Sequence, residues 1–222
     1  MPRPCPLTNQ QKVQNAYMPT SYYLLHISLS DISPEIWRTF VVPSSISLDR
    51  LHDVIQIVMG WNDCHLHEFI ISNKRYTENP EHNDHSIESM LHTLGELLTR
   101  PGRSITYLYD FGDGWNHMIT LVDNDHPVDI KQPHLFCIDG ERACPPEDVG
   151  GVRGYEEFCN AINNKTHRKH ADYIEWLATP SCHPKVFDTE KFNKDTVNLD
   201  LSKYQRWSRD RHCRWDLPNT LL

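Results

Sequence analysis

The chain is 222 residues long, with 38% hydrophobic and 23% charged residues, which is the composition of an ordinary soluble globular protein. This length favours a single domain with extensions over two domains. The formal net charge of -8 at pH 7 argues against a general affinity for nucleic-acid phosphates, which needs clustered lysine and arginine, but it leaves room for a local basic patch.

Cysteine usage and hydropathy bear on the cellular compartment. The seven cysteines are an odd number, widely scattered and without a CxxC pair, so free thiols in a reducing compartment are favoured over a disulfide framework. Residues 1–20 lack the apolar core of a signal peptide, and no apolar run is long enough to cross a bilayer. We therefore expect a cytoplasmic protein without a membrane partner.

Ordered structure is expected to begin after an N-terminal arm. Residues 1–21 are rich in proline and polar residues and are predicted to form a flexible arm. Tyr22–Leu29 and Ile36–Val42 are rich in aromatic and β-branched residues, and Asp31–Pro34 between them has turn chemistry. The two segments are predicted to be strands of a hairpin.

The clearest helix follows this hairpin. Apolar residues recur there at spacings of three, four and three, which places them on one helical face. These residues are Leu48, Leu51, Ile55 and Val58. Ser47 can cap the N-terminus, Asp49 favours its positive end, and Gly60 can supply a left-handed C-terminal stop.

Strands dominate the middle of the chain and helices its last third. Strands are predicted at His65–Ile71, Ile105–Tyr109 and Met118–Val122, with a short helical turn at Ser89–Leu98. Helices are predicted around Tyr155–Ile162, Tyr173–Leu177 and Thr189–Tyr204. This order predicts one α+β domain over residues 22–202, with a mostly antiparallel sheet, one inserted helix and a helical C-terminal third. Residues 203–222 are expected to form a basic, aromatic tail.

Five motifs occur in this order along the chain: PEIWR (34–38), LHDVIQIVMGW (51–61), HLHEF (65–69), YDFGDGWNH (109–117) and CIDGERACPPEDVGGVRGYEEF (137–158). Together they resemble the plasmid pRiA4b ORF-3-like family of small bacterial and archaeal proteins, over roughly residues 22–200. The resemblance implies a roll-like α+β fold and an association with plasmids or mobile elements. It implies no activity, substrate or cofactor.

The turn Tyr109–His117 (YDFGDGWNH) is the first candidate for a working surface. Its glycines permit the positive φ of a tight turn, and Asp110 and Asp113 can accept hydrogen bonds from backbone amides. In a purely structural role the aspartates hold the turn and Trp115 fills the core. In a functional role Asp113 and His117 project into a cleft as a general acid–base pair or as metal ligands.

The motif HLHEF carries two histidines that would share one face of a strand. His65 and His67 could chelate zinc or iron together with a third ligand. Ordinary hydrogen bonds within a half-buried surface are the alternative. One hypothesis is thus a divalent-metal site with the ligands His65, His67, Asp113 and His117. No other cofactor is indicated.

The carboxylate-rich segment Asp139–Gly154 ends at the expected start of a helix. Its prolines and glycines favour an irregular scaffold over the sheet, although freed amides and Arg153 could hold an anion. Glu147, Asp148 and Tyr155 are the residues of this region that could line a cleft. The full set of predicted cleft residues is Asp113, Trp115, His117, Glu147, Asp148 and Tyr155.

Three functions are compatible with these features. The favoured hypothesis is a binding or adaptor module, linked to plasmid or mobile-element biology, that takes a protein or small-molecule ligand in a polar and aromatic cleft. An alternative is a metal-dependent, hydrolase-like enzyme with a His/Asp site. A second alternative is nucleic-acid contact through residues 203–215, where basic side chains alternate with tyrosine and tryptophan.

Overall fold

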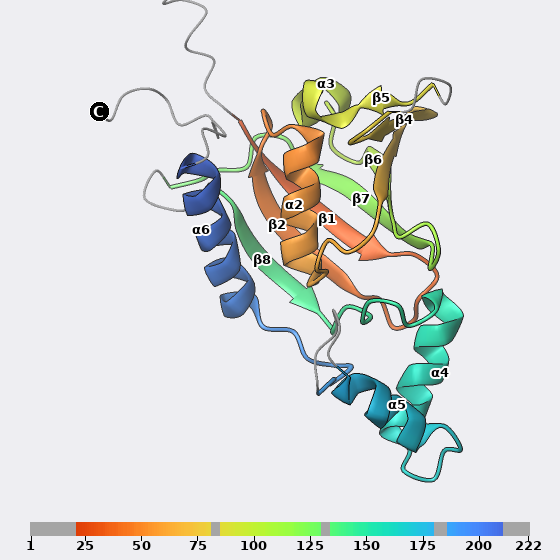
Figure 1. Cartoon of the computed structure of the whole chain (residues 1–222). Coiled ribbons are helices and arrows are strands. Elements are labelled where there is room, and N and C mark those ends of the chain that lie inside the picture. The colour runs from red at the N-terminus through yellow and green to blue at the C-terminus, as the bar shows by residue number, and fades with distance from the viewer. Residues whose placement is uncertain (1–20, 81–84, 130–133, 180–185, 211–222) are drawn as a thin grey trace, which may run out of the picture.

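The computed structural model describes residues 21–80, 85–129, 134–179 and 186–210 (Figure 1). Its strands are β1 (Tyr22–Leu29), β2 (Trp37–Pro43), β3 (His67–Ile71), β4 (Lys74–Thr77), β5 (Ile87–Glu88), β6 (Ser104–Tyr109), β7 (Trp115–Asp123) and β8 (Phe136–Glu141). Its helices are α2 (Leu48–Met59), η1 (Ser89–Leu91), α3 (Leu94–Leu97), α4 (Gly151–Asn163), α5 (His170–Ala178) and α6 (Lys194–Asp210).

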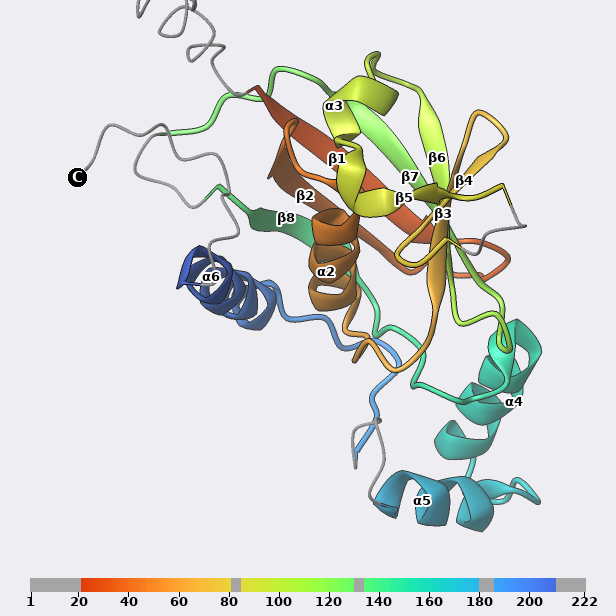
Figure 2. The same ribbon diagram turned by 45° about the horizontal axis from the view of Figure 1, so that its top comes forward.

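The strands of the described chain form a single sheet in the order β5-β4-β3-β6-β7-β1-β2-β8. Its pairings are antiparallel apart from that of β4 with β5. Helix α2 lies across one face of the sheet, α6 runs beside β8, and α4 and α5 project beyond one end (Figures 1 and 2). The predicted α+β class, with its antiparallel sheet, inserted helix and helical C-terminal part, is confirmed.

The core lies between α2 and the sheet. Alternate residues of a strand point to the same face, so every second residue of β1 can be buried beneath the helix. These buried residues are Tyr23, Leu25, Ile27 and Leu29. On α2 the four residues of the predicted apolar stripe are all buried. The spacing of apolar residues in both elements therefore matches the face that each presents to the core.

The two ends of α2 are satisfied in different ways. Gly60 ends the helix in the left-handed conformation, with φ of 100°, as predicted. Ser47 stands at the N-cap position but makes no side-chain cap, because its hydroxyl donates to the carboxylate of Asp49. The first amide, that of Leu48, donates instead to the carbonyl of His92 at 3.0 Å. A neighbouring segment thus helps to fix the start of this helix.

Several boundaries differ from those predicted. β3 begins at His67, so that His65 lies in the preceding turn, and α6 begins at Lys194 rather than Thr189. β8 falls in a region rich in glycine and proline, where only irregular structure was expected; pairing with β2 holds it in place. Helix α6 continues past residue 202 to Asp210.

The predicted N-terminal arm, apart from Ser21, lies outside the described residues, and so do residues 211–222 of the tail. None of the described helices combines the length and hydropathy needed to span a membrane.

Arg38 is a buried cation that joins three parts of the chain, and its side chain is almost entirely shielded from solvent. Its guanidinium donates to the carbonyl of Val58 in α2 at 2.9 Å. It also donates to the carbonyls of Glu141 at 2.7 Å and Arg142 at 2.8 Å, where β8 ends. A Cβ atom on Gly140 would lie 2.6 Å from Cδ of Arg38, so the close approach of β8 requires glycine there.

Candidate metal centre

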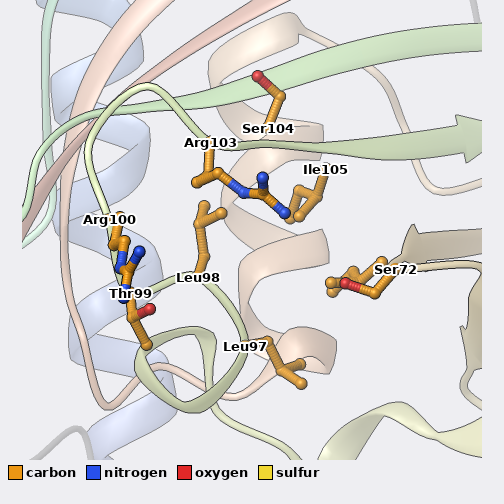
Figure 3. A pocket seen from close by; sticks show the side chains of 9 residues that line it. Ser72, Leu97, Leu98, Thr99, Arg100, Arg103, Ser104 and Ile105 are labelled. Atoms are coloured by element: carbon orange, nitrogen blue, oxygen red, sulfur yellow. The ribbon is translucent and has the colours of Figure 1, made fainter.

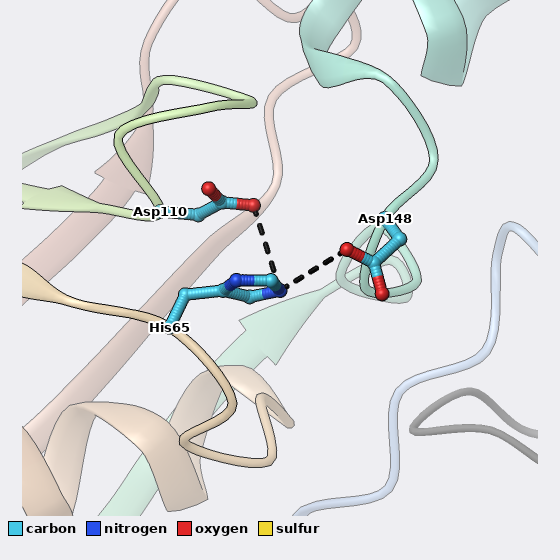
Figure 4. Close-up of side chains that lie close together, drawn as sticks. All are labelled: His65, Asp110 and Asp148. Atoms are coloured by element: carbon cyan, nitrogen blue, oxygen red, sulfur yellow. Dashed lines mark ion pairs between the residues drawn. The ribbon is translucent and has the colours of Figure 1, made fainter.

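One histidine and three carboxylates meet at one end of the sheet. The Nε2 atom of His65 lies 3.3 Å from Oδ1 of Asp148 and 3.6 Å from Oδ2 of Asp110. The same atom lies 3.8 Å from Oε2 of Glu147. Figure 4 shows the carboxylates of Asp110 and Asp148 on two sides of the His65 ring. These four residues, here called the His65 cluster, come from the turn before β3, the turn after β6 and the loop before α4.

Asp110 is held by the turn that it begins. It adopts a positive φ of 56°. Its Oδ1 atom accepts hydrogen bonds from the amides of Gly112 at 2.8 Å and Asp113 at 3.3 Å. Its own amide donates to the carbonyl of Leu66 at 2.9 Å, which ties this turn to the segment carrying His65. One carboxylate oxygen therefore serves the turn, as the sequence predicts, and the other faces the cluster.

Asp113 connects the same turn to α4. Its Oδ2 atom accepts a hydrogen bond from the amide of Gly150 at 3.0 Å. Gly151, the first residue of α4, has φ of +68°, and a Cβ atom there would lie 2.5 Å from the carbonyl oxygen of Asp113. The backbones of the two segments thus approach more closely than a side chain would allow. This contact brings the loop that carries Glu147 and Asp148 up to His65.

The two carboxylate oxygens of Glu147 differ in their hydrogen bonding. Its side chain is 1% exposed. Oε1 accepts hydrogen bonds from the amide of Asn62 at 2.8 Å and from the hydroxyl of Tyr109 at 3.0 Å. Oε2 has no hydrogen-bond partner among the described residues, and it faces His65. Burial raises the pKa of Glu147, although these two donors and the neighbouring His65 oppose the shift.

The geometry and charge of the His65 cluster fit a divalent cation. One ligand atom from each of His65, Asp110 and Asp148 lies within 4.8 Å of the other two. Tetrahedral ligands at about 2.1 Å from an ion stand roughly 3.4 Å apart, close to the separations from His65. The three carboxylates carry more negative charge than a single imidazole can balance, and a divalent ion would offset most of it. One imidazole with carboxylates suits Mn²⁺, Fe²⁺ or Zn²⁺.

The structure does not bring the four predicted metal ligands together, since the rings of His67 and His117 pack in the interior away from His65. The ring of His67 stacks on that of His52, with centroids 3.5 Å apart. Burial, with a smaller effect from His52, lowers the pKa of His67 to about 3. His117 is fully buried; its Nδ1 donates to the carbonyl of Trp115 at 3.0 Å, and its Nε2 accepts from Trp61 at 3.4 Å. Both nitrogens of His117 are therefore in use.

Two further predicted cleft residues pack in the interior. Trp115 is completely buried in the core, which agrees with the predicted role in which it fills the core. Tyr155 of α4 is also buried and stacks on Phe158, in an aromatic group that joins α4 to α5. Of the predicted cleft set, Glu147 and Asp148 are the members that reach His65 directly, and Asp113 positions their loop.

The burial of His117 leads us to expect that the folded protein loses stability in acid. Burial lowers the pKa of this residue from 6.5 to about 4, so below pH 6.5 the unfolded chain binds a proton that the folded chain excludes. Stability should therefore fall as pH falls through this window, by about 2 kcal/mol from this residue between pH 7 and pH 5. Urea unfolding at both pH values should show that His117→Gln loses less stability on acidification than the parent protein. His126→Gln, at a partly buried position outside the core, is the control for the loss of a histidine, and equal pH dependence in His117→Gln and the parent would contradict the assignment.

Comparisons with known proteins place this chain in a set of related chains. A family model described as plasmid pRiA4b ORF-3-like protein matches residues 21–196. The chain is 36% identical over 194 residues to the uncharacterized protein y4hQ of Sinorhizobium fredii (strain NBRC 101917 / NGR234), covering 86% of this chain and 98% of that protein. It is also similar to the crystal structure of MM3350, a protein of unknown function from Methanosarcina mazei Go1, with a TM-score of 0.68 and 32% identity over 78% of this chain and 96% of that one. The names of these relatives state no activity.

Proposed function

Because the chain belongs to the plasmid pRiA4b ORF-3-like family, whose name states no activity, we propose a function from the site itself: the His65 cluster binds one divalent metal ion and uses it in hydrolytic chemistry. The observation that carries this proposal is the buried Oε2 atom of Glu147, which faces His65 without a hydrogen-bond partner among the described residues. A carboxylate oxygen left in this way costs free energy unless a cation or a proton satisfies it.

The cluster divides naturally into ligands and a base. His65, Asp110 and Asp148 offer three ligand atoms, and an ion held by three protein ligands keeps a position for water. Asp148 is 64% exposed, so substrate and water can reach the ion from that side. Glu147 stands next to this position, and its raised pKa suits a group that accepts a proton from water and returns it to a leaving group.

Metal binding and hydrolysis can be tested on the same preparation. Untagged protein should contain Mn, Fe or Zn by elemental analysis, and the chelator-stripped protein should bind one ion per chain in calorimetric titration. Reloaded protein should release p-nitrophenol from p-nitrophenyl phosphate or p-nitrophenyl acetate. Glu147→Gln should retain the ion and lose about 10²–10⁴-fold in rate. A folded protein that takes up no ion at all would refute the proposal.

A binding module is the second candidate, and one observation favours it. Leu66 and Phe111, which directly follow His65 and Asp110, are 69% and 49% exposed. Apolar side chains beside a buried polar group are typical of a ligand-binding surface. In this case Leu66→Ser with Phe111→Ser would abolish binding of the ligand, and stripping the metal would not. A link to plasmid or mobile-element biology, and nucleic-acid contact through residues 203–215, stay predictions.

A further inference from the structure

A second site lies at the opposite end of β6 from the His65 cluster. A pocket of about 350 Å³ opens there between the end of β3, helix α3 and the start of β6 (Figure 3). Three buried apolar side chains, those of Ile71, Leu98 and Ile105, lie at its base, and polar atoms make up the larger part of its accessible lining. Its rim is polar and carries two arginines, Arg100 and Arg103. Apolar side chains together with a few polar groups are usual in a small-molecule site.

The two arginines are brought together by a tight turn. The amide of Arg103 donates to the carbonyl of Arg100 at 3.2 Å, and Gly102 between them has φ of +81°. The first and fourth residues of a β-turn have Cα atoms less than about 7 Å apart, so both side chains start from the same edge of the pocket. In the view of Figure 3 the side chain of Leu98 lies between them, and that of Arg103 extends toward Ile105.

Neither arginine is neutralised by another of the described residues. Within the described ranges, no carboxylate or other acceptor pairs with the side chain of Arg100 or Arg103, although the chain as a whole carries a net charge of -8. Most other arginines with described side chains have such partners: Arg38, Arg50, Arg75, Arg142 and Arg168. Two exposed arginines without an acidic partner among the described residues therefore stand beside the buried apolar side chains of this pocket.

We propose that this pocket binds a small organic anion in which one carboxylate or phosphate group is joined to an apolar body. The guanidinium groups would hold the anionic group with charge-assisted hydrogen bonds, and the apolar body would lie on Leu98 and Ile105. The volume is at the lower end of the range of about 300–1,000 Å³ for such sites, which suits a body the size of one substituted ring. The proposal does not depend on the metal centre, because the two sites are at opposite ends of β6.

Titration followed by amide NMR spectra tests the proposal on the full chain. Phenyl phosphate and benzoate are the anionic probes, and their comparison identifies the preferred anionic group. We expect saturable shifts at millimolar concentration in the amides of residues 97–100 and 102–105. Benzyl alcohol and inorganic phosphate, which each lack one half of the recognised chemistry, should bind at least about tenfold more weakly than the better anionic probe.

Surface variants separate specific binding from weak surface contact. Arg100→Gln and Arg103→Gln should each weaken binding about tenfold, and the double variant should abolish it. Arg206→Gln, an exposed arginine on α6, is the matched control and should bind as the parent does. Shifts that survive in the double variant, equal binding of benzyl alcohol, or no shift with either anion would each overturn the proposal. His65→Ala should bind the probes normally, so failure of the metal proposal would leave this one standing.

Discussion

Replacement of His65 by alanine is expected to weaken the binding of Mn²⁺ or Zn²⁺ by more than about 100-fold, because even the loss of an outer-shell partner of a metal ligand costs about 10–100-fold in affinity. The Nε2 atom of this imidazole lies within 3.8 Å of an oxygen of each of the three carboxylates in the cluster. Calorimetric titration of the chelator-stripped variant measures the effect directly.

The matched control for this experiment is His126→Ala. His126 also lies beside a carboxylate, with Nδ1 3.8 Å from Oδ2 of Asp123, but it stands outside the His65 cluster. Metal affinity should be unchanged in this control, and its unfolding free energy should stay within about 0.5 kcal/mol of the parent, as at most surface positions. If His65→Ala bound metal as tightly as the control, the assignment of His65 as a ligand would be wrong.

Substitution of Gly151 by alanine is expected to destabilise the protein by about 3 kcal/mol. Alanine at a φ of +68° is strained by roughly 1–2 kcal/mol, and its Cβ atom would also lie 2.5 Å from the carbonyl oxygen of Asp113. Relief of this clash would move the start of α4 away from the turn after β6. Asp148 would move with it, so we also expect weaker metal binding. Urea unfolding and calorimetry measure the two effects.

Gly114→Ala separates strain from clash. Gly114 has a similar φ of +71°, but a Cβ atom there would meet nothing within 4 Å. The control should therefore show the conformational cost alone, roughly 1–2 kcal/mol. If both alanine variants lost the same stability, the contact between Gly151 and Asp113 would not be what holds the loop in place.

Elements that depend only on neighbouring residues could be predicted from the sequence. The apolar stripe of α2 and the left-handed stop at Gly60 could be predicted because the spacing and the residue type alone determine them. β8 could not be predicted, because its main-chain partners lie in β2, nearly one hundred residues earlier in the chain. No periodicity in residues 136–141 signals such a pairing.

The candidate site could be predicted only in part, because its residues come from segments that long-range pairing brings together. Residue type alone indicates His65, Glu147 and Asp148 as candidates, but the predicted pairing of His65 with His67 requires both on one strand, and β3 begins only at His67. Asp110 was assigned to the turn alone. Its second role depends on the pairing of His67 with Tyr109 across β3 and β6, which sets the two turns side by side. The close approach of Gly151 to Asp113 then adds the third segment.

The position of Arg38 has a consequence for the order in which the chain can assemble. Its guanidinium needs carbonyl groups from α2 and from the end of β8, so these contacts are incomplete until residue 142 is in place. Before β8 is added, the guanidinium has the carbonyls of Val58 and Trp37 as acceptors, and the end of β8 both covers it and completes its hydrogen bonds. One side chain thereby couples the docking of α2 to the addition of the last strand of the sheet.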